Sequence, residues 1–170
     1  MPAMGDPNFD GTVTYLCRHS DDGALGIIIN RPLEMQVGEV FSQLNFDVTE
    51  NASAEKPVLG GGPVQPGMGF VLHRSKAPFE STLEAAAADI KVTVSKDILS
   101  SMAKGLGPRP ALVALGYAGW EAGQLESEMA ANAWLSVPAD PEIVFETPFQ
   151  ERWAAAAATL GINISQLSTY

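Results

Sequence analysis

An Asp-Gly pair between two strand-like segments constrains the fold of this chain most strongly. Residues 12–17 alternate polar and apolar side chains, the pattern of a half-buried β-strand, and Asp22-Gly23 follows them. Residues 25–29 are almost continuously apolar, which is typical of a strand buried on both faces. Because Asp-Gly favours a tight turn between antiparallel strands, we predict a β-hairpin that ends before Pro32.

Helical and strand patterns follow each other along the rest of the chain. Val37, Val40, Phe41 and Leu44 have helical spacing and predict a short amphipathic helix. Further strands are predicted at 58–59, 70–73, 92–94, 111–115 and 143–145, and further helices after Ser95, over 124–132 and from Thr147 to Gly161. Residues 116–119 are predicted to connect a strand to a helix. This mixture predicts an α/β (or α+β) fold with a mixed sheet, in one domain over residues 1–170.

Composition and charge limit the function classes. The 170 residues are 46% hydrophobic, which indicates a folded globule, and the net charge is −10. Because nucleic acids are bound largely through positive charge, we do not expect direct nucleic-acid binding. No apolar run approaches the roughly 20 residues that span a bilayer. The chain shows no secretory signal pattern and a single cysteine, so we expect a cytoplasmic protein without membrane contact.

Several stretches, in order along almost the whole chain, resemble the YqgE/AlgH family. They are residues 6–9, 16–19 through 23–32, 61–64 with 69–73, and 114–120 with 123–126, extended by 132–135 and 138–141. The resemblance implies a compact α/β domain whose bifurcated sheet forms a pseudo-barrel flanked by helices. It also implies a role in transcriptional regulation, attached to the AlgH branch through alginate genes. No helix-turn-helix with a basic recognition helix is visible, so we expect that role to be indirect.

Cys17 and His19 are the first candidate site residues. They are two apart and share a face if the strand continues that far, and a thiolate beside an imidazole is the minimum for a reactive cysteine. The alternative is a small buried cysteine followed by an edge histidine near a turn. No third orienting group can be identified.

Asn30 and Arg31 form the second candidate, at the end of a buried strand where open sheets often bind ligands. The planar guanidinium of Arg31 could hold a carboxylate or a phosphate. An ion pair with an acidic residue such as Glu34 is the alternative. Asn8, in the first of the family-like stretches, is included among the candidates.

A third candidate lies around residues 117–132. Gln124, Glu128 and Asn132 fall at helical spacing on one polar stripe beside Tyr117 and Trp120, which could line a pocket or a partner surface. A simply solvated stripe is the alternative. The alternative function is an enzyme or a nucleotide- or anion-binding domain, which requires Arg31, His73 and the 117–120 segment to share a pocket.

No complete catalytic or metal-binding motif accompanies these residues. The chain has only two histidines and no Gly-x-Ser-x-Gly motif, and its glycine run at 60–62 lacks the Lys-Ser/Thr of a phosphate loop. We therefore predict no metal, no cofactor and no enzymatic activity. The leading hypothesis is a regulatory protein that binds a protein partner or a small anionic ligand.

Overall fold

The central element of the fold is one long strand. The computed structural model describes residues 9–48, 53–83 and 89–161. Strand β8 (Ala111–Glu121) begins with the apolar run of residues 111–114, all of them buried. The other strands are β1 (Thr14–Ser20), β2 (Gly23–Ile28), β3 (Pro32–Gln36), β4 (Pro57–Gly60), β5 (Val64–His73), β6 (Thr82–Leu83) and β7 (Lys91–Thr93).

The predicted hairpin is confirmed. Strands β1 and β2 pair antiparallel from Thr14 opposite Ile28 to Ser20 opposite Gly23. The register shifts between Leu16 and Arg18, so Cys17 is the extra residue of a β-bulge. Residues 27–29 are almost fully buried, as their apolar run predicted.

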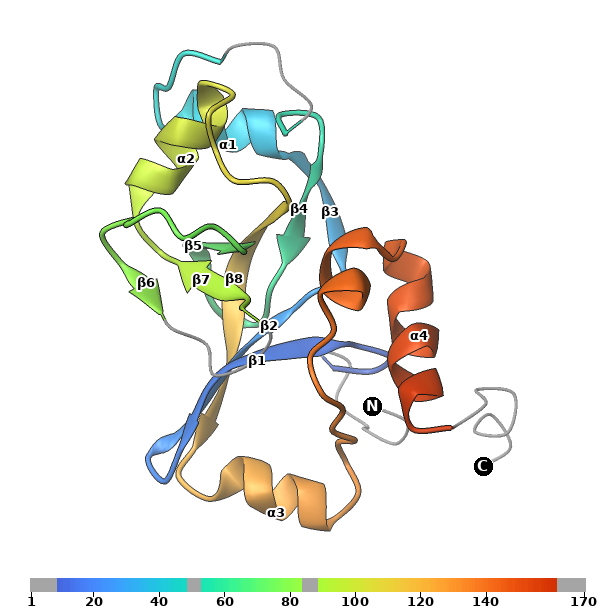
Figure 1. The fold of residues 1–170 in the computed structure, drawn as a ribbon. Helices are drawn as coiled ribbons and strands as arrows, with labels where there is room; N and C mark the ends of the chain where they lie inside the picture. Colours follow the sequence, from blue (N-terminus) through green and yellow to red (C-terminus); the bar gives the residue numbers. More distant parts are fainter. Residues whose placement is uncertain (1–8, 49–52, 84–88, 162–170) are drawn as a thin grey trace.

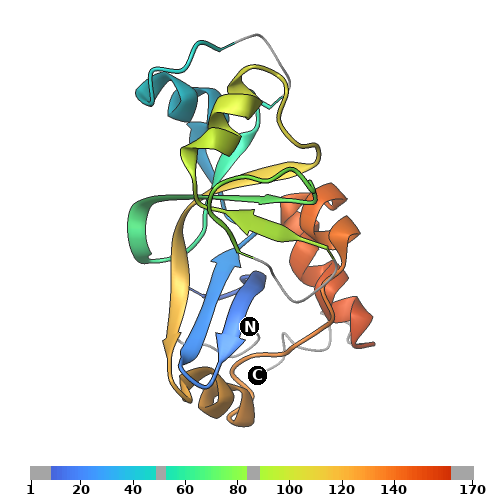
Figure 2. The same ribbon diagram turned by 60° about the vertical axis from the view of Figure 1, so that its left-hand side comes forward.

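The sheet is mixed and closes into a nearly complete barrel, as predicted (Figures 1 and 2). Its main order is β1-β2-β8-β5-β7-β6, and β3 joins through β4. These strands pair antiparallel except β4 and β8, which run parallel. The sheet divides along β8, because the first part of that strand pairs with β4 and β5 and its last residues pair with β2.

The predicted connection at residues 116–119 is wrong, because β8 continues through it to Glu121. Two glycines allow this. Gly116 has a positive φ of 79°, and a Cβ there would lie 2.4 Å from the carbonyl oxygen of Gly62. A Cβ on Gly62 would lie 2.1 Å from the backbone of Tyr117. The glycines therefore let two backbones pack in direct contact, where side chains would separate them.

Helices α1 (Val37–Gln43) and α2 (Lys96–Ala103) confirm the predictions from apolar spacing and from Ser95, which is the N-cap of α2. Helix α3 (Gln124–Ala130) is slightly shorter than predicted. Figures 1 and 2 show α1 and α2 together at one end of the molecule and α3 at the opposite end. None of the helices in the described ranges has the length and apolar character needed to span a lipid bilayer.

The region after residue 140 departs from the predictions. The strand predicted at 143–145 is a π-helical turn, η1 (Glu142–Glu146), in which Val144 is the buried residue. A 3-10 turn, η2 (Phe149–Glu151), and helix α4 (Arg152–Thr159) follow. Helix α4 therefore begins after the predicted Thr147. The Thr147 side chain donates its hydrogen bond back to the carbonyl of Glu142 at 3.1 Å and caps no helix.

Two main hydrophobic clusters lie on opposite sides of the sheet. One fills the barrel with Ile27, Leu59, Phe70 and Leu72, and Val144 from η1 closes it. In the other, α1 and α2 pack against β4, β5 and β8. A third cluster joins Ala118, Trp120 and Leu125, with Phe9 and Trp134 packed against it.

Candidate functional site

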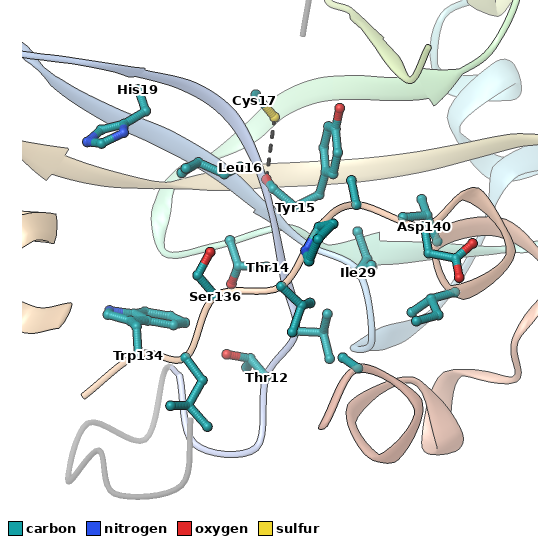
Figure 3. Close-up of a pocket in the computed structure, with 18 of the residues that line it drawn as sticks. Thr12, Thr14, Tyr15, Leu16, Cys17, His19, Ile29, Trp134, Ser136 and Asp140 are labelled. Atoms are coloured by element: carbon teal, nitrogen blue, oxygen red, sulfur yellow. Dashed lines mark hydrogen bonds between the residues drawn. The ribbon is translucent and has the colours of Figure 1, made fainter. Parts of the chain in front are cut away.

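A cavity of about 710 Å³ lies beside β1. We call residues 134–140, which run along this side of the barrel, the strap. Figure 3 shows Thr14 and Leu16 of β1, and Thr12 just before that strand, in the same view as Trp134 and Ser136 of the strap. The walls come from β1, α3, the strap, η1 and α4. Single residues outside these elements also contribute. The apolar lining residues are Val13, Leu16, Ile29, Leu83, Trp120, Leu125, Met129, Trp134, Leu135, Val137, Pro138, Ala139, Ile143, Val144, Trp153, Ala156 and Ala157. The other lining residues are Thr12, Thr14, Tyr15, Cys17, Arg18, His19, Ser136 and Asp140.

One polar group on the cavity wall lacks a partner. The Thr14 hydroxyl is the one buried side-chain oxygen or nitrogen without a hydrogen bond in the described part of the chain. Strand β1 is also the edge of the sheet, and no backbone hydrogen bond joins it to the strap within the described ranges. A buried hydroxyl without a partner costs about 1–3 kcal/mol, so a ligand that bonds to Thr14 would recover free energy.

Glu128 holds the strap in place from helix α3. Its Oε2 accepts hydrogen bonds from the indole nitrogens of Trp120 and Trp134, each at 2.8 Å. Its Oε1 accepts a third from the Gln124 side chain at 3.1 Å. The two indole rings lie edge to face at 5.5 Å, and Phe9 contacts both. One carboxylate therefore fixes the first residue of the strap against β8 and α3.

The candidate residues Cys17 and His19 hydrogen-bond to different partners and not to each other. The Cys17 thiol is buried and donates a hydrogen bond to the Tyr15 carbonyl oxygen at 3.6 Å. Burial raises its pKa to about 12, so the thiol stays protonated at neutral pH. His19 is exposed and its Nε2 contacts the carboxylate of Glu126 on α3, which lowers the pKa of Glu126. The buried-cysteine alternative is the one that the structure shows.

The side chains of Asn30 and Arg31 form hydrogen bonds with the backbone of residues 10–13. The Asn30 side chain accepts a hydrogen bond from the Val13 amide and donates one to the Gly11 carbonyl, both at 2.9 Å. Arg31 donates to the Asp10 carbonyl at 3.1 Å. Asn8 lies outside the described residues.

His73 and Tyr117 are packed inside the fold. His73 is fully buried, and its Nε2 lies 2.7 Å from the Thr93 hydroxyl. Tyr117 packs edge to face on Phe70 at 5.8 Å between ring centres. Neither residue, nor Arg31, lines the large cavity or a second cavity of about 220 Å³. Neither of these two cavities therefore joins Arg31, His73 and the 117–120 segment, and Trp120 is the one residue of that group that lines either of them.

The predicted polar stripe is partly formed. Gln124 and Glu128 are hydrogen-bonded to each other on α3. Asn132 lies past the end of the helix with a left-handed φ of 57°, so it does not continue the stripe. In the described part of the chain, no group of three His, Cys, Asp or Glu side chains could hold a metal ion.

A family profile described as AlgH-like matches residues 1–165 of the chain. The chain belongs to the AlgH-like family. A UPF0301 protein of Pseudomonas paraeruginosa is 51% identical over 169 residues, which are 99% of this chain and 88% of that protein. A UPF0301 protein of Ralstonia nicotianae is 48% identical over 168 residues, again 99% of this chain and 88% of that protein.

Solved structures of similar proteins share the fold of this AlgH-like chain. The solution structure of the AlgH protein from Pseudomonas aeruginosa matches with a TM-score of 0.81 and 49% identity, covering 100% of this chain and 89% of that one. A crystal structure from Corynebacterium diphtheriae matches with a TM-score of 0.74 over 99% of this chain and 87% of that one. At 19% identity, the second match shows the fold alone.

Sequence reasoning on this AlgH-like chain missed three features of its cavities: Thr14, the strap and Arg152. Thr14 looked like one more residue of an alternating strand, and only its tertiary surroundings leave its hydroxyl unpaired. The strap has no period that predicts a helix or strand. Arg152 is the first residue of an alanine-rich helix, and no sequence motif marks it.

Proposed function

We propose that this protein is a non-enzymatic cytoplasmic regulator that binds one mostly apolar small molecule between β1 and the strap. The cavity carries this proposal. Its volume of about 710 Å³ lies within the range of roughly 300–1,000 Å³ that is common for ligand pockets. The lining is mostly apolar, with an unpaired buried hydroxyl at Thr14 in the described part of the chain and other polar side chains at Thr12, Arg18, His19, Ser136 and Asp140. It therefore favours a mostly apolar ligand that also carries a hydrogen-bonding group.

The chemistry of the candidate residues supports binding over catalysis. A cysteine nucleophile acts as the thiolate, and burial keeps the Cys17 thiol protonated. His19 contacts Glu126 at the surface, and His73 is buried against Thr93. The enzyme alternative from the sequence relied on Arg31 and His73 sharing a pocket, and neither residue lines either of the two cavities described above.

The regulatory role is proposed to run through a protein partner. A net charge of −10 opposes contact with DNA phosphates, so an effect on transcription is better explained by ligand-dependent binding to another protein. The strap is the natural element to transmit ligand binding, because it lines the cavity on one side and exposes Leu135 (43% exposed) to solvent.

Tryptophan fluorescence tests the cavity directly. All three tryptophans of the chain, Trp120, Trp134 and Trp153, line it. We expect the neutral apolar dye N-phenyl-1-naphthylamine to quench tryptophan emission saturably and to gain fluorescence itself by energy transfer. An octanol or decanol titration should displace the dye.

Matched variants of α4 locate the binding. Ala156 lines the cavity, whereas Ala154 is exposed on the same helix. Ala156→Phe should fill the cavity and abolish dye quenching, while Ala154→Phe should leave it unchanged. Equal quenching in both variants, each with a cooperative thermal transition, would place the dye elsewhere and contradict the proposal.

A further inference from the structure

A second, smaller cavity lies on the other side of α4's first residue. Its volume is about 220 Å³, and β8, α2, η1 and η2 all contribute to its walls. Val37, Met102, Phe145 and Phe149 make most of it apolar, but two basic residues, Lys56 and Arg152, also line it.

Arg152 is an unusual residue because its side chain is charged and buried. It is 2% exposed. Its Nε donates to the Thr147 carbonyl oxygen at 2.8 Å and its Nη1 to the Ile29 carbonyl oxygen at 2.5 Å. The guanidinium carbon lies 4.4 Å from the centre of the Phe149 ring. Within the described ranges, Nη2 donates to no acceptor, although a guanidinium carries five N–H donors.

Among the residues that the structure describes, no carboxylate forms an ion pair with Arg152. The one ion pair among the described residues joins His19 and Glu126 and does not include Arg152. Acidic residues outnumber basic ones twenty to ten, so the missing carboxylate is not explained by composition. Burial lowers the pKa of Arg152 to about 10, which still leaves it charged at neutral pH. Carbonyl oxygens and a ring face satisfy hydrogen bonds but do not neutralise a buried cation.

Lys56 adds a second positive charge to the same cavity. It is exposed and forms no ion pair with the described residues. The cavity thus combines a buried, hydrogen-bonded guanidinium, an exposed ammonium and mostly apolar walls. A planar carboxylate matches the guanidinium fork, and an apolar group on that carboxylate matches Val37, Met102 and Phe145.

We propose that this cavity is a second ligand site, for a small monocarboxylate with an apolar group. The carboxylate pairs with Arg152 and Lys56, and the apolar group lies against Val37, Met102 and Phe145. The site is separate from the large cavity, because Arg152 and Lys56 do not line that cavity and its tryptophans do not line this one.

Nuclear magnetic resonance titration of the full chain tests this site. We expect benzoate to shift the Arg152 side-chain Nε–H resonance and the Val37 and Val113 methyl resonances saturably, at constant ionic strength. Benzamide has the same shape without the charge and should bind at least tenfold more weakly. Inorganic phosphate supplies charge without the apolar group. Phosphate binding as tight as benzoate, or equal binding of benzamide, would overturn the assigned ligand class.

Three variants separate the site from surface charge. Arg152→Met should abolish the benzoate shifts at Val37 and Val113. Lys56→Met should weaken binding about two- to fivefold, the range expected from one partly exposed ion pair. Lys76→Met removes an exposed lysine that lines neither cavity and should bind as the wild type does. Arg152→Met also removes the hydrogen bond between α4 and Ile29, which follows β2. If that variant unfolds, the comparison of Lys56→Met with Lys76→Met decides the test. Equal affinity in Lys56→Met and Lys76→Met, or benzoate shifts confined to the three tryptophans, would overturn the proposal.

Discussion

At the scale of single residues, burial controls the protonation of His73. Its Nδ1 accepts a hydrogen bond from the Ser75 amide at 3.1 Å, so its Nε2 carries the proton toward Thr93. Phe79 packs edge to face on the ring at 5.5 Å. Burial, with the positive charge of Lys91, lowers the pKa of His73 from 6.5 to about 4. The folded protein therefore holds this histidine neutral well into the acid range.

The pKa of His73 predicts a pH dependence of stability. Its folded pKa lies below its unfolded pKa, so the unfolded chain binds the proton first as the pH falls. The stability contribution is complete above pH 6.5 and is lost as the pH falls toward 4, by about 3 kcal/mol. Urea unfolding between pH 4 and 7 should show this slope in the wild type.

Two histidine variants test the assignment. His73→Gln should flatten the slope between pH 6.5 and 4, whatever it does to stability at pH 7. His19→Gln removes the other histidine, which is exposed, and should keep most of the slope. An unchanged slope in His73→Gln would show that another group titrates.

At the scale of elements, the strap depends on one carboxylate. Glu128 accepts hydrogen bonds from Trp120, Trp134 and Gln124, which come from β8, the strap and α3. No backbone hydrogen bond replaces them, since within the described ranges none joins the strap to β1. Side chains rather than a β-ladder therefore hold this wall of the large cavity.

Removal of that carboxylate should loosen the strap. We expect Glu128→Ala to lower the free energy of unfolding by about 2–3 kcal/mol, because two partly buried indole N–H groups lose their acceptor. Tryptophan emission should shift to longer wavelength as water reaches Trp134. Glu126→Ala, on the same helix, removes only the exposed contact with His19 and should cost clearly less. Equal losses in the two variants would argue against the strap contact as the cause.

At the scale of the whole molecule, two properties matter for function: the positions of the two cavities and the net charge. The barrel divides along β8, and its two ligand-sized cavities lie on either side of the segment from η1 to α4. The excess of ten negative charges is a property of the whole chain and opposes binding to any polyanion.

This charge predicts a negative result with DNA. In a gel-shift assay at physiological salt, the isolated protein should bind duplex DNA more weakly than a non-specific basic domain, whose Kd is about 10⁻⁴ to 10⁻⁶ M. Promoter fragments and random fragments should behave alike. Retention of a promoter fragment in excess of random competitor would show direct recognition and contradict an indirect regulatory role.

Local patterns in the sequence determined those elements whose residues contact near neighbours along the chain. The hairpin of β1 and β2 follows from an alternating segment, Asp22-Gly23 and an apolar run, and α1 follows from the spacing of Val37, Val40, Phe41 and Leu44. In each case the residues that decide the conformation lie within a few positions of each other. The resemblance to the family added the barrel-like sheet, which periodicity alone does not define.

Tertiary structure alone decided the sites. The sequence predicts a connection at residues 116–119, but backbone pairing with β2 and β5 makes these residues part of a strand. The sequence predicts a strand at residues 143–145, but this apolar run pairs with no strand of the described residues and closes the barrel as a π-helical turn. Thr14 and Arg152 acquire their roles from segments more than 70 positions away. Among the described residues, burial leaves the hydroxyl of Thr14 without a partner and the guanidinium of Arg152 without an ion pair. Burial and pairing depend on contacts that no local pattern encodes.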